Sequence, residues 1–302
     1  MTKVEKKHVI LSAFNDCFVK CGGCYNFFGH KKEIVSTDKI IDFLRQLDKN
    51  EIEKVTVSGG EPLARPDIVA LLQKIHALGF KINLDTVGTA FIDLAVTLKD
   101  KCVAPQVALK DIAPFVNMIG IPLDGSNDAV IKTFRHGRKN LFLEQIKVLD
   151  TAEQTTETPV RLCINTVVHQ QNIADLKRIA DILLGYRCIK EWQLFEFMPI
   201  GPLGFLNKDK YAITNKAYNE AFKDLKAYVD EKGGSLKLTK KTKKKRKKLY
   251  VLVDTDGNAW MPDYEKMSIG REKDTTSKRK IIGNILNQAD IEKIILTIKG
   301  NG

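Results

Sequence analysis

Segments with the pattern of buried β-strands alternate with helical segments through the first two thirds of the chain. The apolar runs that read as strands are residues 8–14, 54–62, 80–86, 115–124, 160–168 and 192–200. Apolar residues recur at helical spacing in residues 36–49, 67–79, 139–152 and 172–185. Strands that alternate with helices form a parallel sheet with right-handed crossovers. Six strands are too few for an eight-stranded barrel, so the pattern predicts an α/β fold with either an open sheet or an incomplete barrel.

The alternation ends after residue 205, where the character of the sequence changes. The elements expected beyond it are a helix at residues 213–234, a hairpin at 250–261 and a strand at 278–286. Asp256–Gly257 is the expected turn of the hairpin. We therefore expect a main unit, residues 1–205, followed by a small α+β extension, residues 206–302, that covers one end of the main sheet.

Positive charge is concentrated in one tract of the expected extension, residues 240–248, which reads KKTKKKRKK. The tract supplies eight of the twelve net positive charges of the chain, so basicity is a local feature. Such a run is typical of a solvated loop or of an arm that binds nucleic acid. Its lysines and arginine are also suited to the phosphate groups of a small ligand, and the sequence leaves these alternatives open.

The sequence carries no signal for export or for a membrane. No apolar run reaches the roughly 18 residues that a membrane span needs, and the start, MTKVEKKHVI, lacks the apolar stretch of a signal peptide. The expected location is therefore cytoplasmic, without a membrane partner. Six cysteines in 302 residues are too few for a disulfide scaffold. Clustered cysteines in a reducing compartment are more often metal ligands or catalytic groups.

Half of the cysteines, Cys17, Cys21 and Cys24, lie within the segment CFVKCGGCYN, directly after the first predicted strand. A structural zinc site usually takes four Cys or His ligands, and His30 is a nearby fourth candidate. Three thiolates on one short loop instead suit a 4Fe–4S cluster that leaves one iron open for chemistry. The spacing thus favours an iron–sulfur site and keeps zinc as the alternative.

The spacing C-x-x-x-C-x-x-C, followed by GGEP at residues 59–62, resembles the radical S-adenosylmethionine (radical SAM) superfamily. The resemblance covers residues 8–201 and implies a partial (β/α)6 barrel. It implies an enzyme in which Cys17, Cys21 and Cys24 hold three irons of a 4Fe–4S cluster and SAM chelates the fourth. Reductive cleavage of SAM then gives a 5′-deoxyadenosyl radical that removes a hydrogen atom from the substrate. A reductant such as flavodoxin or ferredoxin is the implied electron donor.

The resemblance also implies which side chains bind SAM. Glycines of the GGEP turn let the backbone approach the methionyl end of SAM, and the acid of the turn accepts a hydrogen bond from its ammonium group. Met198 is the candidate for packing on adenine. Relatives often have an aromatic residue at the position of Gly23. In this chain the nearby Tyr25 is the candidate to supply that ring, or the backbone of Gly23 makes the contact with adenine itself. Pro122 replaces a serine common in strand four, which puts the contacts of that strand in doubt. The implied SAM-binding set is Tyr25, Ser58, Gly59, Gly60, Glu61, Thr86, Asp124, Asn165 and Met198.

The substrate is less constrained by the sequence than the cofactor. No cysteine follows Cys188, so the direct interpretation is a single cluster. The barrel further resembles viperin and the molybdenum-cofactor GTP cyclase, which implies a nucleotide or another anionic small molecule as substrate. The alternative is radical modification of a macromolecule: a ribosomally made peptide precursor (RiPP), an RNA or a glycyl radical enzyme. A role in binding alone is disfavoured because the chain has both the cysteines and the SAM turn.

Overall fold

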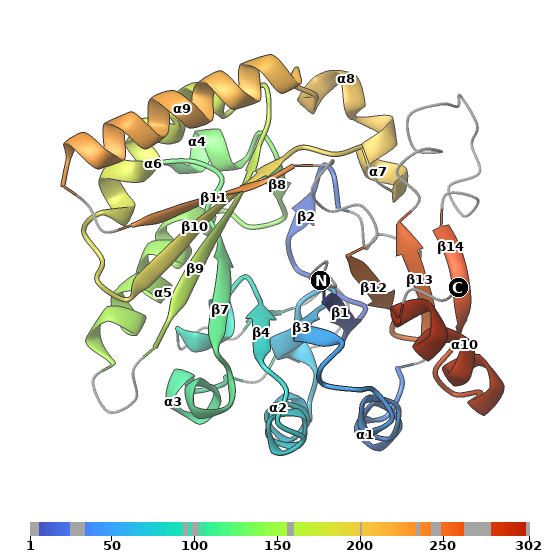
Figure 1. Ribbon diagram of the computed structural model, residues 1–302. Coiled ribbons are helices and arrows are strands. Elements are labelled where there is room, and N and C mark those ends of the chain that lie inside the picture. The colour runs from blue at the N-terminus through green and yellow to red at the C-terminus, as the bar shows by residue number, and fades with distance from the viewer. Residues whose placement is uncertain are drawn as a thin grey trace.

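The computed structural model describes residues 6–24, 34–92, 96–97, 103–104, 106–155, 160–199, 201–233, 236–242, 249–262 and 279–299. Its centre is a curved sheet with the strand order β11-β10-β9-β7-β4-β3-β1-β12-β13-β14 (Figure 1). The pairs β12–β13 and β13–β14 are antiparallel, and the other neighbouring pairs of this sheet are parallel. Two short antiparallel pairs, β2–β8 and β5–β6, lie outside it.

The bounds of the elements follow the predicted alternation. The strands are β1 (Lys7–Ser12), β2 (Lys20–Cys21), β3 (Ile52–Ser58), β4 (Ile82–Asp85), β5 (Val96–Thr97), β6 (Val103–Ala104), β7 (Met118–Pro122), β8 (Arg135–His136), β9 (Leu162–Val168), β10 (Ile189–Glu196), β11 (Lys237–Lys241), β12 (Tyr250–Val253), β13 (Asn258–Pro262) and β14 (Arg279–Asn284). The helices are α1 (Thr37–Arg45), α2 (Ile68–Ala77), α3 (Leu109–Ile112), α4 (Asp128–Ile131), α5 (Leu141–Gln154), α6 (Leu176–Leu183), α7 (Gly201–Leu206), α8 (Lys208–Tyr211), α9 (Asn215–Glu231) and α10 (Gln288–Ile298). Short 3-10 turns are η1 (Pro62–Ala64), η2 (Thr89–Phe91), η3 (Ala113–Phe115) and η4 (Ile173–Asp175).

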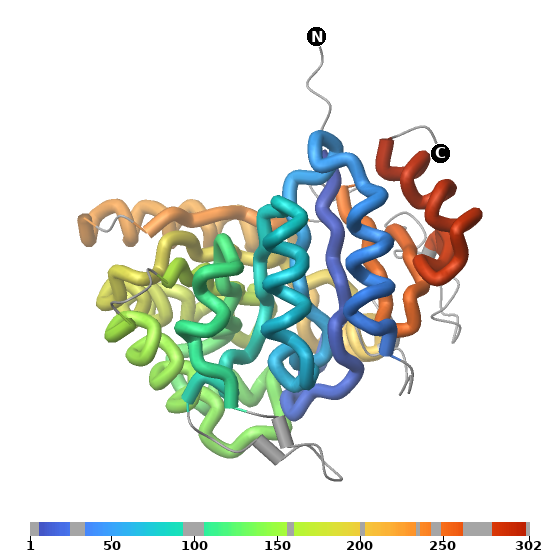
Figure 2. The backbone as a smooth tube through the Cα atoms, turned by 90° about the horizontal axis from the view of Figure 1, so that it is seen from below, coloured from blue at the N-terminus to red at the C-terminus, as the bar shows by residue number. Residues whose placement is uncertain are grey.

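Helices cover the outer, convex face of the sheet. Figures 1 and 2 show α1 and α2 side by side beneath β1, β3 and β4, with α5 and α6 further along the same face. Val55 and Val57 of β3 and Leu71 and Leu72 of α2 are fully buried in the core between these layers. No helix in the described part of the chain is both long and apolar enough to cross a membrane.

Local signals in the sequence set several element ends. The Ser36 hydroxyl accepts a hydrogen bond from the Lys39 amide at 3.4 Å and caps α1. Gly79, with φ at +81°, follows the end of α2. Gly257, with φ at +85°, turns the predicted hairpin between β12 and β13. The left-handed conformations at these two positions favour glycine because it has no Cβ.

The six strands expected from the sequence are present as β1, β3, β4, β7, β9 and β10, which confirms the α/β fold class. Most strand ends differ from the expected ones by a few residues, and the difference matters at β10: it begins at Ile189 and ends at Glu196, so Met198 lies beyond the strand. The last helix, α10, was not expected. Asn287 is the N-cap of this helix, and its side chain accepts a hydrogen bond from the Asp290 amide. Asparagine is a common N-cap residue, so the sequence did carry a signal for the start of α10.

The strands after residue 205 extend the sheet at both of its edges. β11 pairs in parallel with β10, and β12 pairs in parallel with β1. The extension was expected to cover one end of the main sheet, and the structure shows that its strands instead widen the sheet at both edges. The division of the chain at residue 205 remains a prediction. Lys240 and Lys241 of the basic tract form the end of β11, so a solvated loop is wrong for them. Residues 243–248 of the tract lie outside the described residues.

A buried relay of hydrogen bonds ties three of the parallel strands together. Trp192 of β10 is fully buried, and its indole N–H donates to the Thr166 hydroxyl of β9 at 2.8 Å. The Thr166 hydroxyl in turn donates to the carbonyl of Leu123, directly after β7, at 2.5 Å. One hydroxyl thus satisfies a donor and an acceptor that have no access to water.

Thr166→Val should lower the free energy of unfolding by about 1–3 kcal/mol, because valine keeps the shape but leaves both buried partners unsatisfied. Urea unfolding followed by circular dichroism measures the change. Thr151→Val is the matched control, because that hydroxyl bonds only the Lys147 carbonyl on the exposed side of α5. Equal losses in the two variants would contradict the relay.

Candidate functional site

A cavity of about 290 Å³ lies on the concave face of the sheet. Alternate side chains of β1, β3, β4, β7, β9 and β10 point into it, together with side chains from the added strands β11, β12 and β13. Gly23 of the cysteine loop and Arg135 of β8 border the same cavity. Ligands of parallel α/β sheets bind beyond the carboxyl ends of the strands, so the cavity and the loop together form the candidate site.

The three cysteines of the loop form no disulfide and are half-buried. The Val19 amide donates to the Cys17 sulfur at 3.4 Å, and the Cys24 amide donates to the Cys21 carbonyl at 3.2 Å. Burial raises the pKa of Cys17 well above its usual value, and the charges of Glu61, Cys21 and Cys24 raise it further. Cys21 and Cys24 are therefore close enough to Cys17 for their charges to affect its pKa.

The donor set of the loop fits a 4Fe–4S cluster. No three His, Cys, Asp or Glu side chains in the described residues are already arranged as a metal site. The loop nevertheless offers three cysteines outside any disulfide, and its Gly23 borders the cavity. Thiolates are the ligands that such clusters take. Cys17, Cys21 and Cys24 would hold the cluster, which remains the prediction made from their spacing.

The glycine turn after β3 packs directly on the backbone that precedes Cys17. The Gly60 amide donates to the Phe14 carbonyl at 2.8 Å, and the Glu61 amide donates to the Asp16 carbonyl at 2.7 Å. Gly59 has φ at +136°, and a Cβ there would lie 2.7 Å from the Phe14 carbonyl oxygen. A Cβ on Gly60 would collide with the Asp16 carbonyl. Glycine is thus required for the contact with the cysteine segment, while the predicted contact with SAM is untested.

Glu61 and Thr86, predicted as separate SAM contacts, belong to one buried network. Glu61 Oε1 accepts from the Leu63 amide at 3.1 Å and from the Thr86 hydroxyl. Its Oε2 accepts from the Val87 amide at 2.8 Å. Burial raises the pKa of Glu61, and these hydrogen bonds oppose the rise. The network joins the end of β3 to the end of β4, and Ser58 contributes its carbonyl to the Ala13 amide at 2.7 Å.

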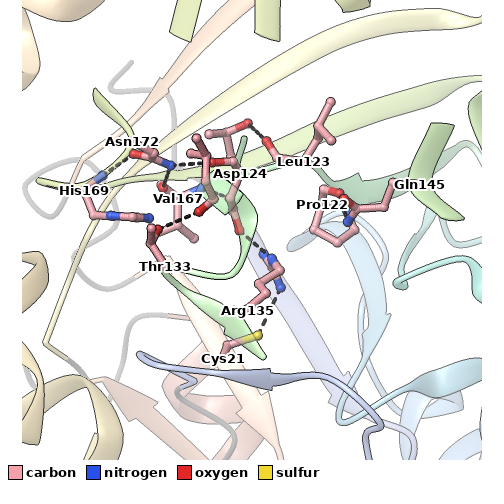
Figure 3. Close-up of polar contacts among 12 residues, drawn as sticks. Cys21, Pro122, Leu123, Asp124, Thr133, Arg135, Gln145, Val167, His169 and Asn172 are labelled. Carbon is pink, nitrogen blue, oxygen red and sulfur yellow. Dashed lines mark hydrogen bonds and ion pairs between the residues drawn. The ribbon is translucent and has the colours of Figure 1, made fainter. Parts of the chain in front are cut away.

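Asp124 lies behind the cysteine loop and is fully buried. Figure 3 shows Arg135 between Asp124 and Cys21, with an ion pair on one side and a 3.1 Å hydrogen bond from Nη1 to the Cys21 sulfur on the other. Asp124 also accepts from the Val167 amide at 2.7 Å. Burial alone would lower the pKa of Arg135, but the charges of Asp124 and Cys21 outweigh it and raise the pKa. The guanidinium therefore stays charged, and Asp124 holds it against the Cys21 sulfur. The predicted contact of Asp124 with SAM stays a prediction.

The remaining predicted SAM contacts divide by location. Asn165 of β9 and Met198 after β10 both border the cavity, as does Glu196. Asn165 donates to Asp85 at 3.2 Å. Tyr25 lies outside the described residues.

Three charged groups of the site were missed by the sequence reasoning: Arg135 and the cavity-lining Lys54 and Asp85. A signal for the last two was present. In the segments KVTVS and INLD, polar and apolar residues alternate with the period of a strand. No comparable signal marks Arg135, because its partner Cys21 is far away in the sequence.

Comparison with known sequences places the chain among SAM-dependent proteins. The sequence profile of the Radical SAM superfamily matches residues 11–183. A GTP 3′,8-cyclase from Listeria monocytogenes is 28% identical over 214 residues, which are 68% of this chain and 58% of the cyclase. An S-adenosylmethionine-dependent nucleotide dehydratase from Flammeovirga pacifica is 24% identical over 248 residues, which are 80% of this chain and 77% of that protein. The chain therefore spans little more than half of the cyclase.

Comparison with solved structures concerns the fold. Streptococcus suis SuiB bound to S-adenosylmethionine matches with a TM-score of 0.66 at 15% identity, over 85% of this chain and 60% of that chain. Native anSMEcpe with bound AdoMet matches with a TM-score of 0.58 at 15% identity, over 94% of this chain and 80% of that chain. Both likenesses agree with the mixed α/β architecture expected from the sequence.

The buried pair of Asp124 and Arg135 gives a prediction that needs no cofactor. Arg135→Gln should lower the free energy of unfolding by about 3–5 kcal/mol, because it leaves a buried carboxylate without its cation. The double variant Asp124→Asn/Arg135→Gln should recover most of that loss, since no charge is left unpaired. Urea unfolding of the iron-free protein measures both.

Arg178→Gln is the matched control for this cycle. Arg178 is exposed and lies 3.9 Å from Asp175, so its loss should change stability by about 0.5 kcal/mol or less. Additive losses in the Asp124 and Arg135 variants would show that the pair is not coupled and would contradict the assigned role of Asp124.

Proposed function

The chain belongs to the radical SAM superfamily, whose enzymes use a 4Fe–4S cluster and S-adenosylmethionine, and we propose that its substrate is a nucleotide or another anionic small molecule. When bound, the cluster and SAM supply a 5′-deoxyadenosyl radical that removes a hydrogen atom from the substrate.

The observation that carries the proposal is the positive charge inside the cavity. Lys54 and Lys241 line it, and Arg135 borders it beside the cysteine loop. Lysine and arginine in a partly enclosed site favour phosphate and carboxylate groups. The names of the relatives, a GTP cyclase and a nucleotide dehydratase, support the same substrate class. Because the chain spans only 58% of the cyclase, we propose hydrogen abstraction from the substrate and not the cyclase reaction.

The cysteine loop is held by aromatic residues that would keep water from the site. A Cβ on Gly22 would collide with the Tyr211 hydroxyl, and one on Gly23 would lie 2.6 Å from Phe197. Tyr211 donates to the Thr133 carbonyl at 2.8 Å, which fixes its ring. The glycines of CGGC therefore let the loop lie flat on this aromatic cluster. Exclusion of water protects reactive intermediates from side reactions.

A peptide is the second candidate substrate. SuiB has a solved structure bound to its precursor peptide SuiA, with a TM-score of 0.67 at 14% identity. This likeness concerns the fold alone, whereas the interior lysines belong to this chain. We further propose a cytoplasmic location and a one-electron donor such as flavodoxin or ferredoxin, which the free thiols of the loop and the family chemistry support.

Protein reconstituted with iron and sulfide without oxygen should hold about four irons per chain, because one loop of three thiolates binds one 4Fe–4S cluster. Cys24→Ala should lose that iron and its visible absorption. Cys188→Ala should keep both, since Cys188 is buried between α6 and β10 and is not part of the loop. Iron and sulfide analysis checks the expectation, and about eight irons per chain would mean a second cluster.

A nucleotide should increase the formation of 5′-deoxyadenosine by the reduced, reconstituted protein. The comparison uses GTP, CTP, ATP and UTP beside the corresponding nucleosides and a set of unrelated peptides, with product measured by chromatography. Stimulation by a nucleotide above its nucleoside follows from the interior lysines. Stimulation by peptides alone would replace the proposed substrate class with the second candidate.

A further inference from the structure

Two neighbouring strands present a polar surface to the cavity, where a parallel sheet is usually apolar. Lys54 and Thr56 of β3 alternate with the fully buried Val55 and Val57. On β4, Asn83 and Asp85 alternate with Ile82 and Leu84. Thr56 lies directly opposite Asn83 in the register of the two strands. We call Lys54, Thr56, Asn83 and Asp85 the polar wall.

Much of the hydrogen-bonding capacity of the polar wall is unused. Asp85 Oδ1 accepts from the Asn165 amide at 3.2 Å. All four residues line the cavity. Within the described part of the chain, no hydrogen bond or ion pair is made by four of their side-chain groups: Asp85 Oδ2, the Thr56 hydroxyl, the side-chain amide of Asn83 and the Lys54 ammonium. Polar groups removed from bulk water cost free energy unless they are paired. A polar ligand would supply the missing partners.

The glycine of the next strand keeps the acceptor of Asp85 in place. Gly120 of β7 lies between Asp85 and Asn165, and a Cβ there would collide with Asp85 Oδ1 and lie 2.6 Å from Asn165 Nδ2. Glycine therefore lets the hydrogen bond form across β7. Because Oδ1 is held by Asn165 and Asp85 lines the cavity, the carboxylate is oriented before a ligand arrives. Such preorganisation strengthens binding.

The charges around the polar wall have both signs. Burial raises the pKa of Asp85 to about 6, and the charge of Lys54, the hydrogen bond from Asn165 and the charge of Lys241 oppose the rise. Lys241 belongs to β11, at the far edge of the sheet from β3 and β4, yet its charge reaches Asp85. At neutral pH the cavity thus holds an acceptor carboxylate together with the ammonium groups of Lys54 and Lys241.

We propose that the polar wall recognises the substrate: Lys54 pairs with a phosphate, and Asp85 Oδ2 accepts a hydrogen bond from a sugar hydroxyl or a base amino group. The inference rests on the proposed function and gives that function a specific surface. A ligand must carry an anion and a donor together to satisfy both ends. A nucleotide does so, whereas inorganic phosphate lacks the sugar and base groups and a nucleoside lacks the anion.

The length of β3 leaves room for the cofactor beside this ligand. Lys54 lies four residues before Ser58, the last residue of the strand, which is about 13 Å at 3.3 Å per residue. The cysteine loop packs beyond Ser58, against the glycine turn. The phosphate would therefore lie deep in the cavity, and the sugar and base nearer to the loop.

The test measures nucleotide binding by calorimetry to the reconstituted protein with SAM present. The best binder among GTP, CTP, ATP and UTP is compared with its nucleoside and with inorganic phosphate. Lys54→Met should weaken nucleotide binding about 10- to 100-fold, the usual effect of losing a charge-assisted bond, and should leave nucleoside binding unchanged. Asp85→Asn should weaken nucleotide and nucleoside alike. Thr56→Val is a milder variant that removes only a hydroxyl.

Matched controls are Lys147→Met and Asp224→Asn, which change the same side chains at exposed positions and should bind as the original protein does. Wall variants that keep the original nucleotide affinity would overturn the inference and leave the proposed function intact. Loss of SAM binding instead of nucleotide binding would assign the wall to the cofactor and also overturn it. If SAM is cleaved but no nucleotide binds, the nucleotide proposal fails together with the wall.

Discussion

The close contact between the glycine turn and the cysteine segment sets the geometry of the whole site. Gly59 and Gly60 lie against the backbone of residues 14–16, where any side chain would force the two segments apart. Cys17 is the next residue, so this packing fixes where the thiols begin relative to the end of β3. The strands before these two segments, β1 and β3, also line the cavity. Loop and cavity are therefore positioned by one set of backbone hydrogen bonds.

Two buried carboxylates hold this arrangement from opposite sides. Glu61 joins the turn to the end of β4, and Asp124 holds the guanidinium of Arg135 against Cys21 (Figure 3). Each carboxylate was predicted as a SAM contact, which stays a prediction, and each has a structural role in the described residues. The two roles of Glu61 are compatible, because Oε2 accepts one hydrogen bond from Val87 and a carboxylate oxygen can accept two.

The sequence predicted the parts of the fold that depend on local pattern. The six alternating strands and the hairpin turn at Gly257 were confirmed because each depends on a few adjacent residues. The partners of β11 and β12 were not predictable, since strand pairing at a sheet edge depends on distant segments. The link from Arg135 to Cys21 was missed for the same reason. The motif residues could be identified, but not which of them share one network.

The polar wall shows why alternation within a strand matters for function. Lys54 and Thr56 occupy the positions of β3 that face away from the helices, and Val55 and Val57 occupy the helix-facing ones. A residue's identity as polar or apolar assigns it to a face, but only the curvature of the sheet decides whether the other face meets solvent or a cavity. Here the sheet curves around that face, so the polar residues line an interior. An interior lined by unpaired polar groups is stable only when something polar, water or ligand, fills it. The polar side chains of the wall therefore reduce apolar packing on this face of the sheet, and the same side chains provide the charges and hydrogen-bonding groups for the proposed recognition of a charged substrate.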